Sequence, residues 1–143
     1  MTAVAIAGCA GTTEDGTVSI PLAATLRNAG QIGRAFLTPR GATTDIRVEV
    51  SGVPPLVTTR PIHLYTFLYD GACDRLPAKP AHALTDRVLA QSARTAGTPM
   101  AGPFTVSNTA AMSLEALRRA GYAIVIRTSP ADGYVEIFCG AIR

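Results

Sequence analysis

Apolar and polar residues alternate along most of this chain, and this period of two is typical of β-strands rather than helices. The clearest case is the stretch 44–53, in which Ile46, Val48 and Val50 alternate with charged or hydroxyl-bearing residues at 45, 47, 49 and 51. Such alternation predicts one buried and one solvated face, as in an antiparallel sheet. Further strands are predicted at 17–27, 32–39, 103–108, 122–128 and 134–139.

The stretch 62–73, Ile-His-Leu-Tyr-Thr-Phe-Leu-Tyr-Asp-Gly-Ala-Cys, is expected to organise the fold. Its alternation divides the strand into two faces. One face carries His63, Tyr65, Phe67 and Tyr69, and the other carries Leu64, Thr66, Leu68 and Asp70. A glycine turn then leads to Cys73 and a loop that extends to residue 80.

Turn residues separate the other predicted strands, and Pro21 suggests an edge or bulge position within the first of them. The stretch 82–91 is either a strand or irregular. A short helix is predicted from Ser113, a candidate N-cap, to Gly121, a stop signal. Seven or eight short strands with almost no helix predict an all-β sandwich.

Composition limits the class of protein. The 143 residues, 48% of them hydrophobic and 16% charged, suit one folded domain. The net charge is +3, and Lys79 is the one lysine. Arginines are scattered along the chain, whereas nucleic-acid proteins usually concentrate basic residues on one face. We therefore expect no nucleic-acid partner.

The N-terminus carries a different signal. Ile6-Ala7-Gly8-Cys9 resembles the lipobox of bacterial lipoproteins, in which the cysteine is lipidated, but no Lys or Arg precedes it. Either residues 1–16 are a truncated signal and tether, with Cys9 as the lipidation site, or they are a frayed segment with a buried cysteine. The first interpretation predicts membrane attachment only through lipid on Cys9 and a folded domain over 17–143.

The other two cysteines, Cys73 and Cys139, form a candidate disulfide, because no Cys-x-x-Cys or zinc-module spacing occurs. Such a bond requires an oxidising compartment. Two reduced core thiols in a cytosolic protein are the alternative.

Three stretches together resemble the copper,zinc superoxide dismutase-like family. The first runs from Gly33 to Pro55, with a strand pair that ends in Gly-Val-Pro-Pro. The second is 67–73, which falls where the family has His-x-His-Glu-Gly-x-Cys, and the third is 113–142, whose late cysteine would complete the family disulfide. The resemblance implies a Greek-key β-sandwich or flattened barrel of about eight antiparallel strands with one intramolecular disulfide.

The family's metal ligands are missing at the matching positions. The His-x-His pair corresponds to Phe67 and Tyr69, and the late-strand histidine corresponds to Arg127. Only His63 and His82 occur in the chain, too few imidazoles to hold copper through a redox cycle. We therefore expect no dismutase activity, no catalytic residues, no bound metal and no cofactor.

An aromatic–arginine cluster is expected in place of the metal. The resemblance places Arg127 near Tyr65, Phe67 and Tyr69, where a guanidinium over a ring gains roughly 0.5–2 kcal/mol. Buried rings would make the cluster a structural plug. Open rings beside Arg127, with His63 on the same face, would make it a recognition patch.

The sequence thus predicts a non-catalytic, exported envelope protein, periplasmic or surface-anchored, that acts as a binding or structural module. Its partner is an unidentified protein or envelope component, and a homodimer is compatible with the sequence. The alternative is a metal-binding protein, for copper in particular, or an enzyme with a site outside the family pattern, built from His63, Met100, Met112 or Cys9. A third possibility is salt-dependent binding of an anionic polymer through the scattered arginines.

Overall fold

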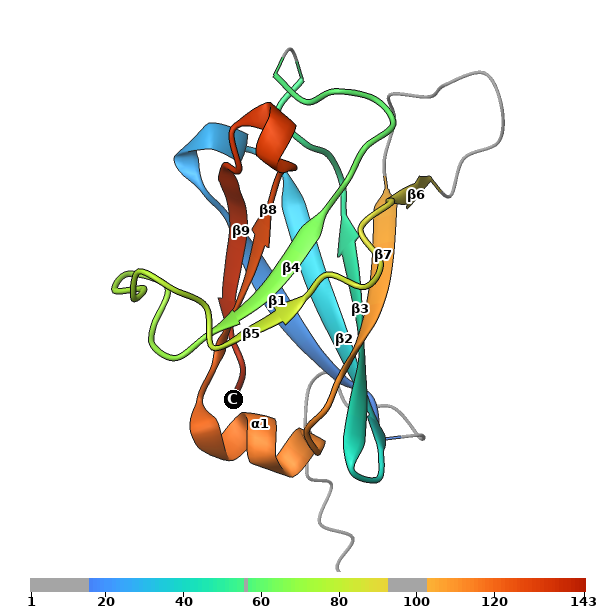
Figure 1. The fold of residues 1–143 in the computed structure, drawn as a ribbon, viewed down its shortest axis with the longest axis vertical. Helices are drawn as coiled ribbons and strands as arrows, with labels where there is room; N and C mark the ends of the chain where they lie inside the picture. The colour runs from blue at the N-terminus through green and yellow to red at the C-terminus, as the bar shows by residue number, and fades with distance from the viewer. Residues whose placement is uncertain (1–15, 56, 93–102) are drawn as a thin grey trace, which may run out of the picture.

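The computed structural model describes residues 16–55, 57–92 and 103–143 (Figure 1), so Cys9 and Met100 lie outside the described residues. The described chain contains nine strands, one α-helix and two 3-10 turns. Their order is β1 (Val18–Ala24), η1 (Leu26–Asn28), β2 (Ile32–Arg40), β3 (Thr43–Val50), β4 (Tyr65–Tyr69), β5 (His82–Leu84), β6 (Gln91–Ser92), β7 (Phe104–Ala110), α1 (Leu114–Ala120), β8 (Ala123–Arg127), η2 (Pro130–Asp132) and β9 (Glu136–Ala141).

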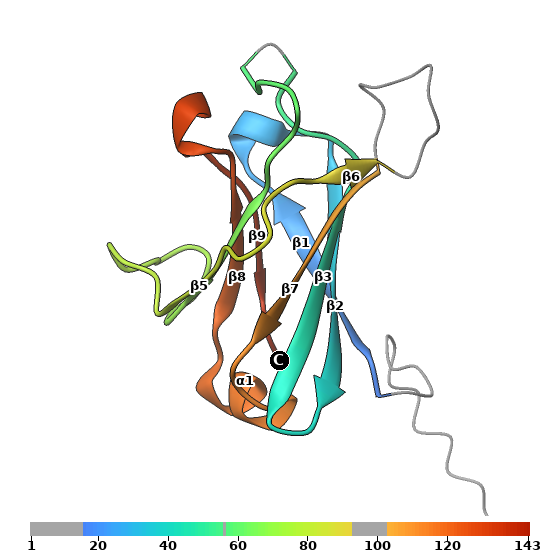
Figure 2. The same ribbon diagram turned by 45° about the vertical axis from the view of Figure 1, so that its right-hand side comes forward.

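All nine strands belong to one antiparallel sheet in the order β5-β4-β8-β9-β1-β2-β3-β7-β6. The sheet curls into a half-barrel (Figures 1 and 2). The prediction of an all-β antiparallel fold with little helix is confirmed. The ladder runs without a break from β5 to β6. The strand count exceeds the expected eight because residues 82–92 contribute two short strands.

The segment 82–92 spans the two edges of the curled sheet. At one end β5 pairs with β4, and at the other β6 pairs with β7. Between them the Asn108 side chain accepts a hydrogen bond from the Arg87 amide and donates one to the Arg87 carbonyl, both at 2.9 Å. These two side-chain hydrogen bonds hold the segment 82–92 against β7 where no backbone ladder joins them.

The interior core follows from strand alternation, since the inward residues of the strands pack into one cluster. Its fully buried members include Leu37, Ile46, Val48, Leu64, Leu68, Ile124, Ile126 and Phe138. The ring of Phe138 lies against Gly33, where an added Cβ would approach it to 2.9 Å. A glycine is therefore required at this position for β2 to pack close to the ring.

Helix α1 closes one end of the half-barrel and buries Leu117 completely (Figures 1 and 2). The Ser113 hydroxyl accepts a hydrogen bond from the Ala116 amide, and Gly121 ends the helix in the left-handed conformation at φ 69°. The predicted N-cap and stop are both confirmed.

The predicted strand over 62–73 is shorter in the structure, where β4 covers Tyr65–Tyr69. The residues before it pair elsewhere: the Leu64 amide donates to the Val88 carbonyl, and the Ala90 amide donates to the Ile62 carbonyl. The predicted division of faces is confirmed, because Leu64, Thr66 and Leu68 point into the interior and the ring-bearing residues point outward.

Pro21 has no amide hydrogen to donate, and it occupies a position in β1 that is in register with a neighbouring strand on one side only. It lies opposite Arg34 of β2, whereas β9 is in register with β1 only at Ala23 and Ala24. Proline is thus placed where β1 has a ladder on one side.

A disulfide joins Cys73, in the loop after β4, to Cys139 in β9, with a Cα–Cα distance of 5.9 Å. The predicted pairing is confirmed. Cys73 is exposed and Cys139 is 5% exposed, so the bond ties a surface loop to the sheet.

Removing this bond is expected to lower the free energy of unfolding by about 4 kcal/mol, because it closes a loop of 66 positions. The test compares the double variant Cys73→Ser, Cys139→Ala with the wild type in urea unfolding, each with and without reductant. The wild type should lose stability on reduction and the variant should not. Equal free energies of unfolding for the wild type and the variant in the absence of reductant would show that loop closure contributes nothing.

Candidate functional site

The outward-facing aromatic residues of β4 lie on a surface shared with β8 and β9. Tyr65 is in register with Arg127, and Phe67 with Val125, which in turn pairs with Cys139. Side chains in register on neighbouring strands share a face. The aromatic residues, the arginine and the disulfide therefore gather on the outside of the half-barrel.

These residues form a second hydrophobic cluster, separate from the interior core. Phe67 and Tyr69 are each 4% exposed, and Val125 beneath them is fully buried. Partly buried Leu76, from the loop after β4, and Tyr134, from the turn before β9, pack against them. An outer sheet face that would otherwise be solvated is thus covered.

Tyr134 is a member of this cluster that sequence reasoning missed. Its ring centroid lies 5.5 Å from that of Phe67 and 5.9 Å from that of Tyr65. Its backbone adopts φ 54°, directly after Gly133 at φ 92°, and the Tyr134 amide donates to the Ser129 carbonyl. The signal available was its place at the start of the predicted strand 134–139, directly after the turn that connects this strand to the one that carries Arg127.

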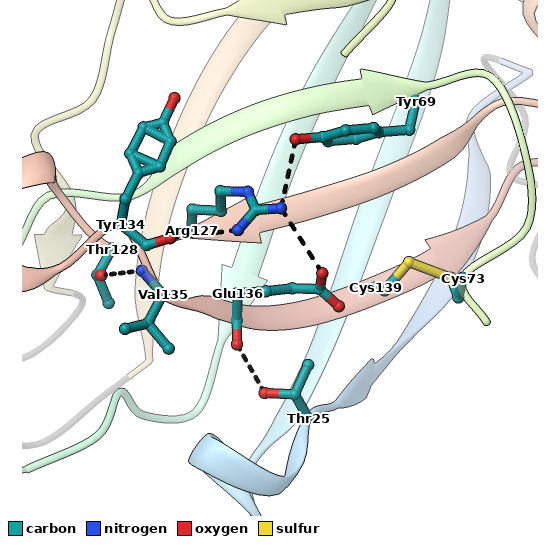
Figure 3. Close-up of polar contacts among 9 residues, drawn as sticks. All are labelled: Thr25, Tyr69, Cys73, Arg127, Thr128, Tyr134, Val135, Glu136 and Cys139. Carbon is teal, nitrogen blue, oxygen red and sulfur yellow. Dashed lines mark hydrogen bonds and ion pairs between the residues drawn. A yellow bond between two sulfur atoms is a disulfide. The ribbon is translucent and has the colours of Figure 1, made fainter. Parts of the chain in front are cut away.

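The Arg127 guanidinium connects the cluster (Figure 3). It donates to the Tyr69 hydroxyl at 3.3 Å and to the Tyr134 carbonyl at 3.2 Å, and it lies 3.8 Å from a carboxylate oxygen of Glu136. Its central carbon is 5.7 Å from each of the Tyr69 and Tyr134 ring centroids. The side chain is only 23% exposed, and both of its terminal nitrogens donate a hydrogen bond within the chain. We call Tyr65, Phe67, Tyr69, Arg127, Tyr134 and Glu136 the Arg127 cluster.

Exposure separates the two interpretations of this cluster. The rings of Phe67 and Tyr69 are packed and closed to solvent, while Tyr65 and Tyr134 are half-buried. Their burial favours a structural plug. The cluster presents no open aromatic platform at Phe67 or Tyr69.

His63 lies beside the cluster rather than within it. It is half-buried, pairs through its backbone with Leu89, and lines a groove of about 320 Å³ with Arg60, Tyr65 and Ser129. Nearby, the Asp132 carboxylate accepts hydrogen bonds from the Thr59 hydroxyl and amide. Both bonds hold the pKa of Asp132 below its ordinary value, and the bond from the Thr59 hydroxyl has the larger effect.

The remaining candidate ligands are dispersed. His82 is exposed, and its ring packs edge-on against Tyr122 with centroids 5.5 Å apart. Met112 packs against the interior core, and its carbonyl accepts from the Thr44 hydroxyl. In the part of the chain that the structure describes, no three His, Cys, Asp or Glu residues lie together as a metal site would require.

Comparisons with known proteins found no family model, no curated protein and no solved structure that matches this chain. Over residues 16–55, 57–92 and 103–143, no helix is both long and apolar enough to cross a membrane.

The hydrogen bond between Arg127 and Tyr69 is expected to contribute measurably to stability, because both groups are largely removed from water. A double-mutant cycle with Tyr69→Phe and Arg127→Met should give a coupling free energy of about 1 kcal/mol in urea unfolding. The matched control is Arg119→Met: Arg119 is 76% exposed in its pair with Glu115, and its loss should cost under about 0.5 kcal/mol. Zero coupling would show that the bond contributes nothing to stability.

Tyr134 is expected to make stability fall at alkaline pH. Burial, and then the nearby Tyr69, raise the pKa of Tyr134 above its ordinary 10.0. The folded state therefore holds this proton more tightly than the unfolded chain does. The associated stability is constant below about pH 10 and is lost as the pH rises toward the folded-state pKa.

The measurement compares the wild type with Tyr134→Phe by urea unfolding at about pH 9 and pH 11. The wild type should lose more free energy of unfolding over this interval than the variant. Tyr122→Phe, a tyrosine outside the cluster, is the control and should behave as the wild type. An equal loss in Tyr134→Phe and the wild type would contradict the assignment.

Proposed function

We propose that this chain is a non-catalytic, metal-free member of the superoxide dismutase-like fold, exported to the bacterial envelope, where it acts as a binding module on a disulfide-linked scaffold. The observation that carries the proposal is the Arg127 cluster. At the positions that match the family's copper ligands, the chain has a benzyl ring, a phenol and a guanidinium, packed against one another.

The connectivity supports this kinship. The hairpin strands β1, β2 and β3 are followed by two long crossings of the half-barrel, from β3 to β4 and from β7 through α1 to β8. As a result β7 lies beside β3 and β9 lies beside β1. We take these long returns to be related to a Greek key, in which a strand comes back over a long connection to lie beside a hairpin-connected set. The segment 82–92, which bridges β4 and β7, supplies the connection that would close the barrel.

The residues at the matching positions do not fit copper. Phe67 has no lone pair to donate, and a guanidinium carries donors only and a positive charge. Tyr69 is 4% exposed, and its hydroxyl accepts a hydrogen bond from Arg127. Copper in proteins is held by imidazole and by softer sulfur ligands. No redox step can therefore be derived from these residues at this position.

The envelope location rests on the cysteines. The Cys73–Cys139 bond is of a kind that persists in oxidising compartments such as the periplasm. Lipidation of Cys9 stays part of the proposal, and mass spectrometry of the mature protein isolated from membranes would detect the added acyl mass.

Metal analysis tests the central claim. Protein secreted from cells grown with copper and zinc should contain both metals far below one per chain, and it should not accelerate superoxide decay. The variant Phe67→His, Tyr69→His, Arg127→His restores three imidazoles on one face of β4 and β8 and should bind copper. The control variant Arg27→His, Asp74→His, Arg119→His places three at exposed, dispersed positions and should not.

One copper per wild-type chain would overturn the proposal and favour the alternative, a metal-binding protein with a site outside the family pattern. Loss of that copper in His63→Ala would assign the site to the groove beside the cluster.

A further inference from the structure

Strands β2, β3 and β7 lie side by side in the sheet (Figure 1). A groove with charged, hydroxyl-bearing and apolar lining residues crosses their outer face. Its volume is about 530 Å³, within the range of small-molecule sites. The lining residues that matter here are Phe36, Asp45, Arg47, Arg87, Ser107 and Thr109. The groove shares none of its residues with the Arg127 cluster.

Arg47 lines this groove, and contact with the Phe36 ring holds its guanidinium in place. Its guanidinium carbon lies 4.5 Å from the centroid of the Phe36 ring, a cation–π arrangement that restrains a long side chain. Its nearest carboxylate is Glu49, at 3.7 Å, and the Arg47 side chain is 51% exposed. An ion pair so long and so exposed contributes little, so the edge of the guanidinium stays available to a ligand.

Arg87 presents a second cation from the segment 82–92. Its backbone is fixed on both sides by the Asn108 side chain, which anchors the start of the arginine. The exposed side chain makes no hydrogen bond or ion pair with other residues of the described chain. Its five N–H donors are free to bind an oxyanion.

The one carboxylate that lines the groove is already engaged. Asp45 accepts from Arg40 at 3.0 Å and from the Thr109 hydroxyl at 2.9 Å. These bonds hold the pKa of Asp45 below its ordinary value, and the charge of Arg87 lowers it further. Asp45 therefore remains ionised and paired, and it does not take up the donors of Arg47 and Arg87.

We propose that this groove binds an acidic saccharide, whose carboxylate is held between Arg47 and Arg87 and whose hydroxyl groups meet the hydroxyls of Ser107 and Thr109. Guanidiniums match carboxylates through paired N–H donors. A groove of this volume exceeds what one small ion fills, and its hydroxyl-bearing walls suit a hydroxylated ring. The assignment rests on the proposed binding function and names its ligand class.

The experiment titrates the full chain with a galacturonate trisaccharide, the matching neutral galactose trisaccharide, and inorganic phosphate, by calorimetry and by amide chemical shifts. We expect binding of the galacturonate ligand only, with affinity that falls as salt increases. Arg47→Gln and Arg87→Gln should each weaken it by at least about tenfold, because each removes charged hydrogen bonds.

The matched control is Arg34→Gln, an exposed arginine on the same sheet face that bonds Ser19 and lies outside the groove. It should change the affinity less than about twofold, since it touches no proposed ligand group. Tyr69→Phe, in the Arg127 cluster, should also bind normally.

Three outcomes would overturn the inference: no binding of the galacturonate ligand, equal binding of the neutral sugar, or equal binding of phosphate alone. None of these results bears on the metal content of the protein. Failure of the groove assignment is thus distinguishable from failure of the proposed function, which metal analysis decides.

Discussion

Burial of β4 on both of its faces is the constraint on which this structure depends. Thr66 and Leu68 are buried on the interior side, while Phe67 and Tyr69 enter the outer cluster. A strand in a curled sheet normally keeps one face wet, and its register is then set by one hydrophobic pattern. Here a shift of one residue would remove β4 from two cores at once, so its register against β8 is specified twice.

The outer cluster can be closed because its charged member is satisfied within the chain. Arg127 reaches a phenol hydroxyl, a backbone carbonyl and the carboxylate of Glu136, and two tyrosine rings flank it. A buried cation without such partners would cost several kcal/mol, whereas one with partners fixes the turn between β8 and β9 against β4. The disulfide adds a covalent link at the other end of the same face, between the loop after β4 and Cys139. Together these contacts make the position rigid, which suits a plug.

Much of the fold could be predicted from sequence because the pattern is local. Alternation gave the two faces of β4, and Ser113 and Gly121 gave both ends of α1, since caps and strand faces depend on neighbouring residues. The division of 82–92 into β5 and β6 could not be predicted, because it depends on how that segment spans distant strands. The order of the strands could not be predicted for the same reason: no local signal tells whether β9 pairs with β1.

The candidate site was predictable only in part. The resemblance placed Arg127 near the aromatic residues of β4, and the two lie within hydrogen-bond distance. Tyr134 was missed because its contribution depends on a left-handed backbone in the turn, a conformation unusual for tyrosine. The groove on β2, β3 and β7 was also missed. Its residues come from three strands and the segment 82–92, and each of them, taken alone, reads as an ordinary solvated position.

The two outer faces of this half-barrel differ in a way that bears on function. On β4, β8 and β9 the outward residues are aromatic, and their charges are neutralised within the chain. On β2, β3 and β7 they include Arg47, hydroxyl-bearing residues, Phe36 and Asp45, and Arg87 from the segment 82–92 makes no hydrogen bond or ion pair with other described residues. The first face is closed at Phe67, Tyr69 and Arg127, the positions that the resemblance matches to metal ligands. Its contacts make the scaffold rigid and involve no residue of the second face. Because the two sets share no residue, changes on one should leave the other intact. A fold whose aromatic outer face is closed thus retains a separate outer surface that is open to a ligand.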